Sequence, residues 1–393
     1  MSDRLEPTAI PQSSPGRDYR RHKGEIDAAI ERALDSGWYI LGPEVRAFEA
    51  EFAGYLGLRE GVGVASGTDA VELALKALGI GPGDAVYTVS HTAVATVVAI
   101  ERTGATPVLV DVDEASLTMD PDSLAAALAA DSRPAGSRPR AVMAVHLYGH
   151  TAAMAEIVKI ARGAGLFVVE DCAQAHGARS DGRVAAAWGD IAAFSFYPTK
   201  NLGALGDGGL VATDDSELAA RLRELRQYGW RDRYISAVPG MNSRLDEIQA
   251  AILRAKLPHL SEDNARRRAI AARYDAGLAG SAVRTPIVRA GCEHVFHQYV
   301  VRTPRRDDLL ASLRERGIST AIHYPVPVHL QPAYAGRLPR PVELPITEMI
   351  AGEILSLPIF PSLSDREVDR VIEAVLEWTE RAPRVVARAR DAG

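Results

Sequence analysis

Seven short apolar segments, separated by helical stretches, constrain the fold of this 393-residue chain more than any other feature. The segments are rich in β-branched and small apolar residues, and the stretches between them repeat apolar positions at helical spacing. This alternation predicts strands joined by crossover helices, and the continuously apolar segments predict helices on both faces of one sheet. The expected strands cover residues 62–65, 85–89, 107–112, 141–146, 166–170, 191–196 and 209–213.

The pattern changes near residue 260. A long helical region from about 244 to 278 is followed by a strand over 298–302, a helix over 307–316, a strand over 319–324 and a terminal helix from Ser364. We therefore expect a large α/β domain over 22–260 with a mainly parallel seven-stranded sheet, a smaller α+β domain over 261–393, and a flexible N-terminal segment over 1–21.

Composition excludes several function classes. The chain has 45 Lys and Arg against 51 Asp and Glu without a basic block, so a nucleic-acid partner is not expected. No stretch has the length of a membrane span, and the polar, Pro-rich first 21 residues resemble neither signal peptide nor anchor. Cys172 and Cys292 are too few for a disulfide framework or a metal cluster, which favours a cytoplasmic protein without a metal site.

Ser66-Gly67-Thr68-Asp69 follows the first expected strand and begins an amphipathic helix. Free backbone N–H groups and the helix dipole at such a junction favour a phosphate group. The same residue types also cap helices without any ligand, and both interpretations stay open from this motif alone.

Asp171 ends the apolar run that begins at Leu166. An acidic residue that leaves a buried parallel strand lies where open α/β sheets bind ligands. Such a carboxylate can keep a pyridinium nitrogen protonated, which makes the ring an electron sink; the alternative is an Asp that caps the next turn. Glu170 should point to the other side of the strand, and we assign it no role.

Lys200 follows the apolar strand that ends near Phe196 and enters a Gly-rich turn, Leu202-Gly203-Ala204-Leu205-Gly206-Asp207-Gly208-Gly209. In a desolvated site its pKa falls, which leaves a neutral amine able to form a Schiff base with an aldehyde and to move protons afterwards. A surface lysine after a strand is the ordinary alternative, and the surrounding sequence argues against it.

These motifs together resemble those of the DegT/DnrJ/EryC1/StrS aminotransferases, fold-type I pyridoxal-phosphate enzymes that act on nucleotide-linked keto-sugars. Four landmarks occur in order over about residues 26–376: Ala65-Ser66-Gly67-Thr68-Asp69-Ala70, Glu170-Asp171-Cys172-Ala173-Gln174-Ala175-His176-Gly177, Ser195 to Lys200, and Gly240-Met241-Asn242-Ser243-Arg244.

The resemblance implies a role for each matching residue. Lys200 would carry pyridoxal phosphate covalently, Asp171 would pair with the pyridine nitrogen, and Gln174 would contact the phenolic oxygen. The phosphate would be bound by Gly67, Thr68 and Ser195. Asn242 would reach the active site of a neighbouring subunit, which implies a homodimer with shared sites.

One position departs from the family pattern. The residue that stacks on the cofactor ring is typically aromatic, and here it is Ala93. We expect either that His91 covers the ring or that the ring is less constrained, with helix capping as the alternative role of His91.

Two further segments are candidates for substrate binding. The run that contains His323, Tyr324 and His329 suits hydrogen bonds to sugar hydroxyls, and Tyr197 would lie on the same side; a Pro-stiffened structural turn is the alternative. The segment from Tyr228 to Tyr234 includes Arg231, and its basic and aromatic side chains suit a nucleotide diphosphate or a dimer interface.

The version of the lysine motif in this chain resembles that of members that aminate carbon 3 of dTDP-3-keto-6-deoxyhexoses. We therefore expect L-glutamate to convert the cofactor to pyridoxamine phosphate, which then passes the amino group to the sugar. Amination at carbon 4, or of a cyclitol, stays open. A sugar 3-dehydratase would carry histidine in place of Lys200, and a catalytically silent cofactor-binding sensor would not need Lys200, Asp171 and Gln174.

Overall fold

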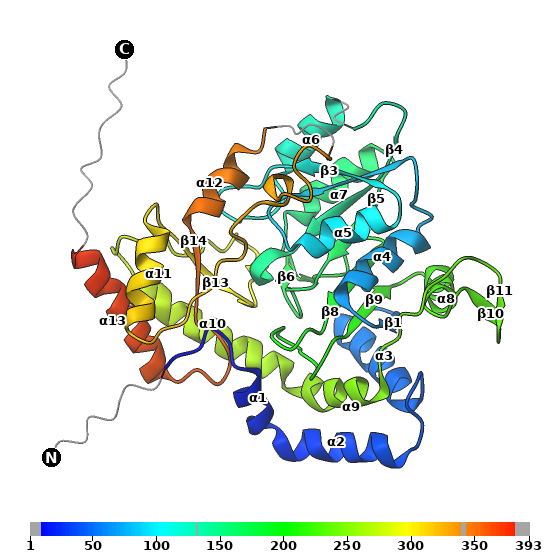
Figure 1. The fold of residues 1–393 in the computed structure, drawn as a ribbon, viewed down its shortest axis with the longest axis horizontal. Coiled ribbons are helices and arrows are strands. Elements are labelled where there is room, and N and C mark those ends of the chain that lie inside the picture. The colour runs from blue at the N-terminus through cyan, green and yellow to red at the C-terminus, as the bar shows by residue number, and fades with distance from the viewer. Residues whose placement is uncertain (1–8, 131–132, 339–342, 382–393) are drawn as a thin grey trace.

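The computed structural model describes residues 9–130, 133–338 and 343–381. Its centre is a seven-stranded sheet in the order β1-β9-β8-β5-β4-β2-β3 (Figure 1). Strands β8, β5, β4, β2 and β3 run parallel, and β9 pairs antiparallel with both β1 and β8. The strands are β1 Glu60–Val64, β2 Asp84–Val89, β3 Thr106–Val110, β4 Arg138–Val145, β5 Phe167–Asp171, β8 Ile191–Ser195 and β9 Gly209–Thr213. The predicted mainly parallel seven-stranded sheet is confirmed.

Helices cover both faces of this sheet because successive strand residues point in opposite directions. On β4, Ala141 and Met143 pack with α4, α5 and α8, whereas Val142 and Ala144 pack with α6 and α7. Helices α3 and α9 cover the β8–β9 end of the second face. These helices are α3 Pro43–Leu56, α4 Gly67–Ala77, α5 Val94–Arg102, α6 Pro121–Ala129, α7 Met154–Gly163, α8 Ser216–Leu225 and α9 Glu247–Lys256.

The N-terminal residues from 9 onward are packed, so the expectation of a flexible segment up to residue 21 is wrong for residues 9–21. Ile10 is fully buried in the core of the C-terminal region, and its backbone bonds those of Gly317 and Ser319. Helix α1 (Pro15–Arg21) follows, and α2 (Lys23–Asp35) then packs against α9. Ile10 lies between Ala9 and Pro11 and belongs to no periodic pattern of apolar residues, so this packing could not be predicted from the sequence. Residues 1–8 lie outside the described residues.

The C-terminal region packs helices around a two-stranded sheet of β13 (Tyr299–Arg302) and β14 (Ile354–Leu357). Its helices are α10 Leu260–Gly277, α11 Arg306–Glu315, α12 Pro345–Glu353 and α13 Asp365–Arg381. The strand expected over 319–324 is wrong: only Ala321 forms a bridge, to Ser356. The chain then leaves the sheet and carries Tyr324 toward the large domain, where its hydroxyl accepts a bond from the side chain of Gln174.

Short elements complete the chain. The 3₁₀ helix η2 (Leu257–His259) divides the predicted long helical region into α9 and α10, and η1 (Leu147–Gly149) and η3 (Val328–Leu330) lie in connections. Hairpin β10–β11 (Trp230–Asp232, Ile235–Ser236) projects from the large domain (Figure 1). Strands β12 (Cys292–Glu293), β6 (Arg179–Ser180) and β7 (Arg183–Val184) form a small sheet. None of the helices in the described ranges is long and apolar enough to cross a membrane.

Candidate active site

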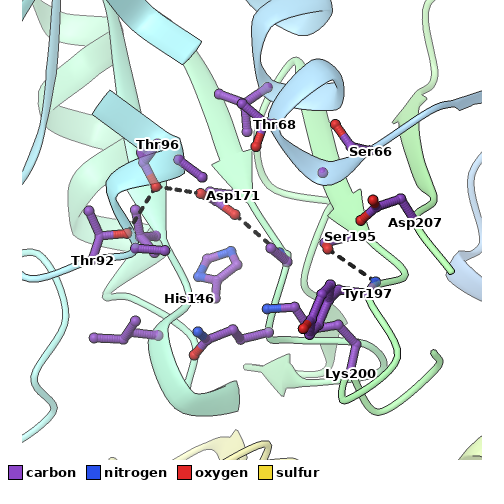
Figure 2. A pocket seen from close by; sticks show the side chains of 18 residues that line it. Ser66, Thr68, Thr92, Thr96, His146, Asp171, Ser195, Tyr197, Lys200 and Asp207 are labelled. Atoms are coloured by element: carbon purple, nitrogen blue, oxygen red, sulfur yellow. Dashed lines mark hydrogen bonds between the residues drawn. The ribbon is translucent and has the colours of Figure 1, made fainter. Parts of the chain in front are cut away.

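A cavity of about 230 Å³ opens where β4, β5 and β8 end and α4 and α5 begin. This is the edge of an open α/β sheet at which ligands bind. Its lining brings together residues from all three principal motifs of the sequence: Gly67, Thr68, Asp171, Gln174, Ser195, Tyr197 and Lys200. Figure 2 shows the side chains of Thr68, Asp171, Ser195, Tyr197 and Lys200 around one space.

The N-terminus of α4 forms one end of the cavity. Ser66 caps the helix, since its Oγ accepts a hydrogen bond of 3.1 Å from the backbone N–H of Asp69, so the capping interpretation holds for this residue. A Cβ at Gly67 would lie 2.5 Å from Cβ of Ser195, so a side chain there would fill the space between the two motifs. The helix start therefore offers free N–H groups and a positive dipole end to an anion beside two hydroxyl groups.

Asp171 closes another side of the cavity at the end of β5. Its Oδ2 accepts a hydrogen bond of 2.9 Å from Thr96 Oγ1, and its Oδ1 accepts one of 3.1 Å from the backbone N–H of Ala173. Thr96 in turn bonds Thr92 over 2.9 Å (Figure 2). The carboxylate is thus fixed in orientation, with both oxygens bonded in a site that excludes most water.

Lys200 enters the cavity from the turn that follows β8. Burial lowers the pKa of its amine to about 8, although the negative charge of Asp171 opposes the shift. About a tenth of the amine is therefore neutral at pH 7, which is far more than for a lysine in water. Lys200 and Asp171 both line this one cavity.

The neighbour Asn201 holds this turn in place. Its Nδ2 donates to Asn264 Oδ1 on α10 over 2.8 Å and to the backbone oxygen of Val295 over 3.0 Å. Its Oδ1 lies 3.1 Å from Nδ1 of His297. The lysine-bearing turn is therefore anchored by residues from the chain beyond residue 260.

The match to a family model decides the identity of this fold and site. Residues 20–376 match the DegT/DnrJ/EryC1/StrS aminotransferase family. The chain belongs to this family.

Relatives in this aminotransferase family cover nearly the whole chain. The dTDP-3-amino-3,4,6-trideoxy-alpha-D-glucose transaminase of Streptomyces venezuelae is 51% identical over 382 residues, which is 97% of this chain and 99% of the relative. The crystal structure of S. venezuelae DesV in complex with a ketimine intermediate superposes with a TM-score of 0.92 at 51% identity, covering 96% of this chain and all of that one.

Another solved family structure contains a cofactor. NtdA from Bacillus subtilis, with bound cofactor PMP, superposes with a TM-score of 0.86 at 29% identity, and the match covers 97% of this chain and 87% of that chain. The predicted fold-type I architecture is confirmed by these neighbours, and the protein is an aminotransferase.

His146 also lines this aminotransferase cavity, and the sequence analysis missed it. Its Nδ1 accepts a bond from the backbone N–H of Ala152 over 3.0 Å, so Nε2 carries the proton and donates to Glu170 Oε2 over 2.9 Å. Glu170 accepts three further bonds from backbone N–H groups of residues 186, 188 and 189. The position of His146 at the end of the strand expected over 141–146 was the available signal. Glu170 itself, unlike Asp171, does not line the cavity.

His91 does not line the cavity. The imidazole of His91 is buried, and its Nε2 donates to the hydroxyl of Tyr148 over 2.8 Å. Burial lowers the pKa of this imidazole to about 4. Ala93, two residues on, lines the cavity instead. A neutral, bonded and enclosed imidazole at this place is not available to cover a ring in the cavity.

Three predicted candidates, His323, Tyr324 and His329, come from the chain beyond residue 260. Tyr324 reaches the cavity region through its hydroxyl, which accepts a bond of 3.3 Å from Gln174 Nε2. His323 bonds Ser356 Oγ through Nδ1 over 2.8 Å, and His329 bonds Ser90 Oγ through Nδ1 over 2.7 Å. Both histidines thus link two segments of the chain through side-chain hydrogen bonds, and neither lines the cavity.

Three remaining candidates lie outside this cavity. Asn242 lines a more open depression of about 560 Å³, which shares Ser66 and Asp207 with the cavity. Tyr228 and Arg231 belong to the projecting hairpin segment, where Arg231 pairs with Glu224 over 3.2 Å. Within one chain the structure therefore brings together the cofactor motifs but leaves the aromatic and basic hairpin apart from them.

Proposed function

We propose that the protein transfers an amino group from L-glutamate to carbon 3 of a dTDP-linked 3-keto-6-deoxyhexose, with pyridoxal phosphate as cofactor. The observation that carries the proposal is that Lys200 and Asp171 line one cavity beside a helix N-terminus. The carboxylate of Asp171 accepts two hydrogen bonds there, which fix its orientation. The S. venezuelae relative, whose name states a dTDP-3-amino sugar, supports the substrate class at 51% identity.

The residues in the cavity fit the proposed cofactor. The start of α4, with Gly67 and Thr68, and the facing Ser195 would hold its phosphate, and the close approach at Gly67 supports this because a Cβ would fill the space. Asp171 would hold the ring nitrogen in its protonated form, and Gln174 would contact the phenolic oxygen. When bound, pyridoxal phosphate supplies an aldehyde that exchanges amino groups and a ring that withdraws electrons.

Lys200 would carry the cofactor and then move protons in both half-reactions. Its lowered pKa keeps part of the amine neutral near pH 7, so it can accept a proton from the carbon that bears the amino group and return one. The Asp171 carboxylate would be held in place because Thr96 and the backbone N–H of residue 173 both donate to it. Lys200 would therefore move the protons, while Asp171 would stay fixed beside the ring nitrogen.

The sugar would bind at the open side of the cavity, near Tyr197 and Tyr324. Tyr197 is 52% exposed and lines the cavity, so its hydroxyl is free to contact a ligand. We assign Asn242, with its family role, to the active site of a second subunit, because it does not line the cavity of its own chain. Tyr228 and Arg231 do not line that cavity either, and we place them at the same subunit boundary, where they would meet the nucleotide diphosphate. The proposed assembly is a homodimer with shared sites.

Ala93 would leave one face of the ring without aromatic cover, because His91 is enclosed elsewhere.

We assign cofactor binding to the large domain, residues 22–260, and treat residues 261–393 as the small domain. We place the enzyme in the cytoplasm, where the two unbridged cysteines would remain reduced.

The test is the visible spectrum of the purified enzyme with pyridoxal phosphate, before and after L-glutamate and then with dTDP-keto-sugars. Loss of the band of the lysine-bound cofactor with glutamate, and its recovery with a 3-keto-sugar, would support the proposal. Recovery with a 4-keto-sugar or a keto-cyclitol alone would reject the substrate, and failure of glutamate to change the band would reject the donor.

A further inference from the structure

Two histidines and a glutamate converge on the surface at the start of α2, remote in sequence from the cofactor motifs. His22 lies between α1 and α2, Glu25 lies in the first turn of α2, and His259 ends η2 just before α10. Residues three apart at a helix start share one face, which places His22 and Glu25 together toward His259. In Figure 1 this junction lies at the lower edge of the molecule, beside α10.

The three side chains are in direct contact. The rings of His22 and His259 stack with centroids 4.0 Å apart, and Nε2 of His259 lies 2.9 Å from Oε2 of Glu25. One ligand atom from each of the three residues lies within 4.8 Å of the others. Nε2 of His22 is buried and has no hydrogen-bond partner among the described residues. A shielded imidazole nitrogen without a partner costs free energy unless something binds it.

The electrostatic surroundings favour a cation here. Glu25 contributes a negative charge, and Asp263, although paired with Arg21 over 2.8 Å, lies close enough to act on His22.

We propose that His22, Glu25 and His259 form a binding site for one divalent transition-metal ion, with Zn²⁺ as the favoured metal. Two imidazole nitrogens and one carboxylate oxygen are a common zinc donor set, and three protein ligands leave a fourth position for water. The ion would link the start of α2 to the η2–α10 junction and so fasten the N-terminal helices to the rest of the chain. This site departs from the sequence prediction of no metal, because only folding brings His259 to the other two residues.

The second His, Glu and Cys cluster of the described chain is a poor competitor. His146, Glu170 and Cys172 also lie within 4.8 Å of one another but are fully buried. Both ring nitrogens of His146 are already bonded, and Glu170 accepts four hydrogen bonds. An ion would have to break all of these bonds, whereas at the surface site it would replace the single bond between His259 and Glu25, and Nε2 of His22 has no partner to lose.

The experiment is a calorimetric titration of the full-length, cofactor-loaded enzyme with Zn²⁺ alone, together with thermal unfolding with and without Zn²⁺. We expect one ion per chain and a higher Tm with zinc. His22→Phe and His259→Phe keep a stacked ring but remove a ligand, and each should weaken binding by at least about 10- to 100-fold. Glu262→Gln is the matched control, because it removes a nearby charge on α10 without touching the three ligands.

Visible absorption of bound Co²⁺, which reports coordination by nitrogen and oxygen, provides a second measurement and should be lost in both histidine variants. The proposal is overturned if zinc leaves the wild-type titration and Tm unchanged, or if His22→Phe binds zinc as tightly as wild type does. Equal weakening by Glu262→Gln and His22→Phe would also overturn it, since general charge attraction would then explain the binding. None of these outcomes depends on the proposed transamination.

Discussion

Replacement of Thr96 by valine tests whether the orientation and charge of Asp171 depend on this one hydroxyl. Thr96 is fully buried and donates to Asp171 Oδ2 over 2.9 Å. Valine has the same shape, so the change removes the donor without creating a cavity. A hydrogen bond to a charged group contributes about 1.5–3 kcal/mol. If Asp171 must stay charged to hold the ring nitrogen protonated, the loss corresponds to a rate decrease of roughly 10- to 150-fold.

The assay is a single-turnover measurement of the reaction with L-glutamate, followed by absorbance, together with the Kd for pyridoxal phosphate of the cofactor-free protein. Thr96→Ser keeps a hydroxyl and should restore most of the rate. Thr92→Val removes only the bond to Thr96 and should have a smaller effect than Thr96→Val. A Thr96→Val enzyme with wild-type rate and wild-type cofactor affinity would refute the reasoning.

Three further predictions follow from the cavity. Lys200→Ala should abolish turnover and the absorption band of lysine-bound cofactor, and retention of both would refute its role. Because burial lowers the pKa of Lys200 to about 8, the rate at which the cofactor-free protein captures pyridoxal phosphate covalently should rise with pH up to about 8 and level off above it; a rise that continues to pH 10 would contradict this. Gly67→Ala places Cβ 2.5 Å from Cβ of Ser195 and should lower the free energy of unfolding by about 1–3 kcal/mol. It should also weaken the binding of the cofactor. Gly54→Ala, with no atom within 4 Å of its Cβ, should not destabilise, and urea unfolding distinguishes the two.

The sheet and the principal cofactor motifs were predictable because each depends on a short stretch of sequence. Strand β8 and the turn after it carry Lys200, strand β5 ends at Asp171, and both patterns are local. Strands buried on both faces are continuously apolar, which makes them visible without knowledge of their neighbours.

The roles of Thr96 and His146 could not be predicted because they depend on contacts between elements. In the sequence, Thr96 is one residue of an apolar helix and has no visible role. Its hydroxyl contacts Asp171 only because α5 packs beside the end of β5. The same limit explains the wrong strand over 319–324, since its β-type residues border a sheet whose second strand is instead β14.

The bonds that Asn201 makes across the domain boundary have a consequence for protein engineering. Substrate specificity within a family can be altered by exchanging whole segments between relatives, and the change of sequence pattern near residue 260 suggests a junction there. A chimera joined there would replace Asn264 and His297, which hold the turn beside Lys200 from the C-terminal side. Such an exchange will therefore preserve catalysis only if the donor segment carries an asparagine at the position of Asn264 and the same backbone course at residue 295.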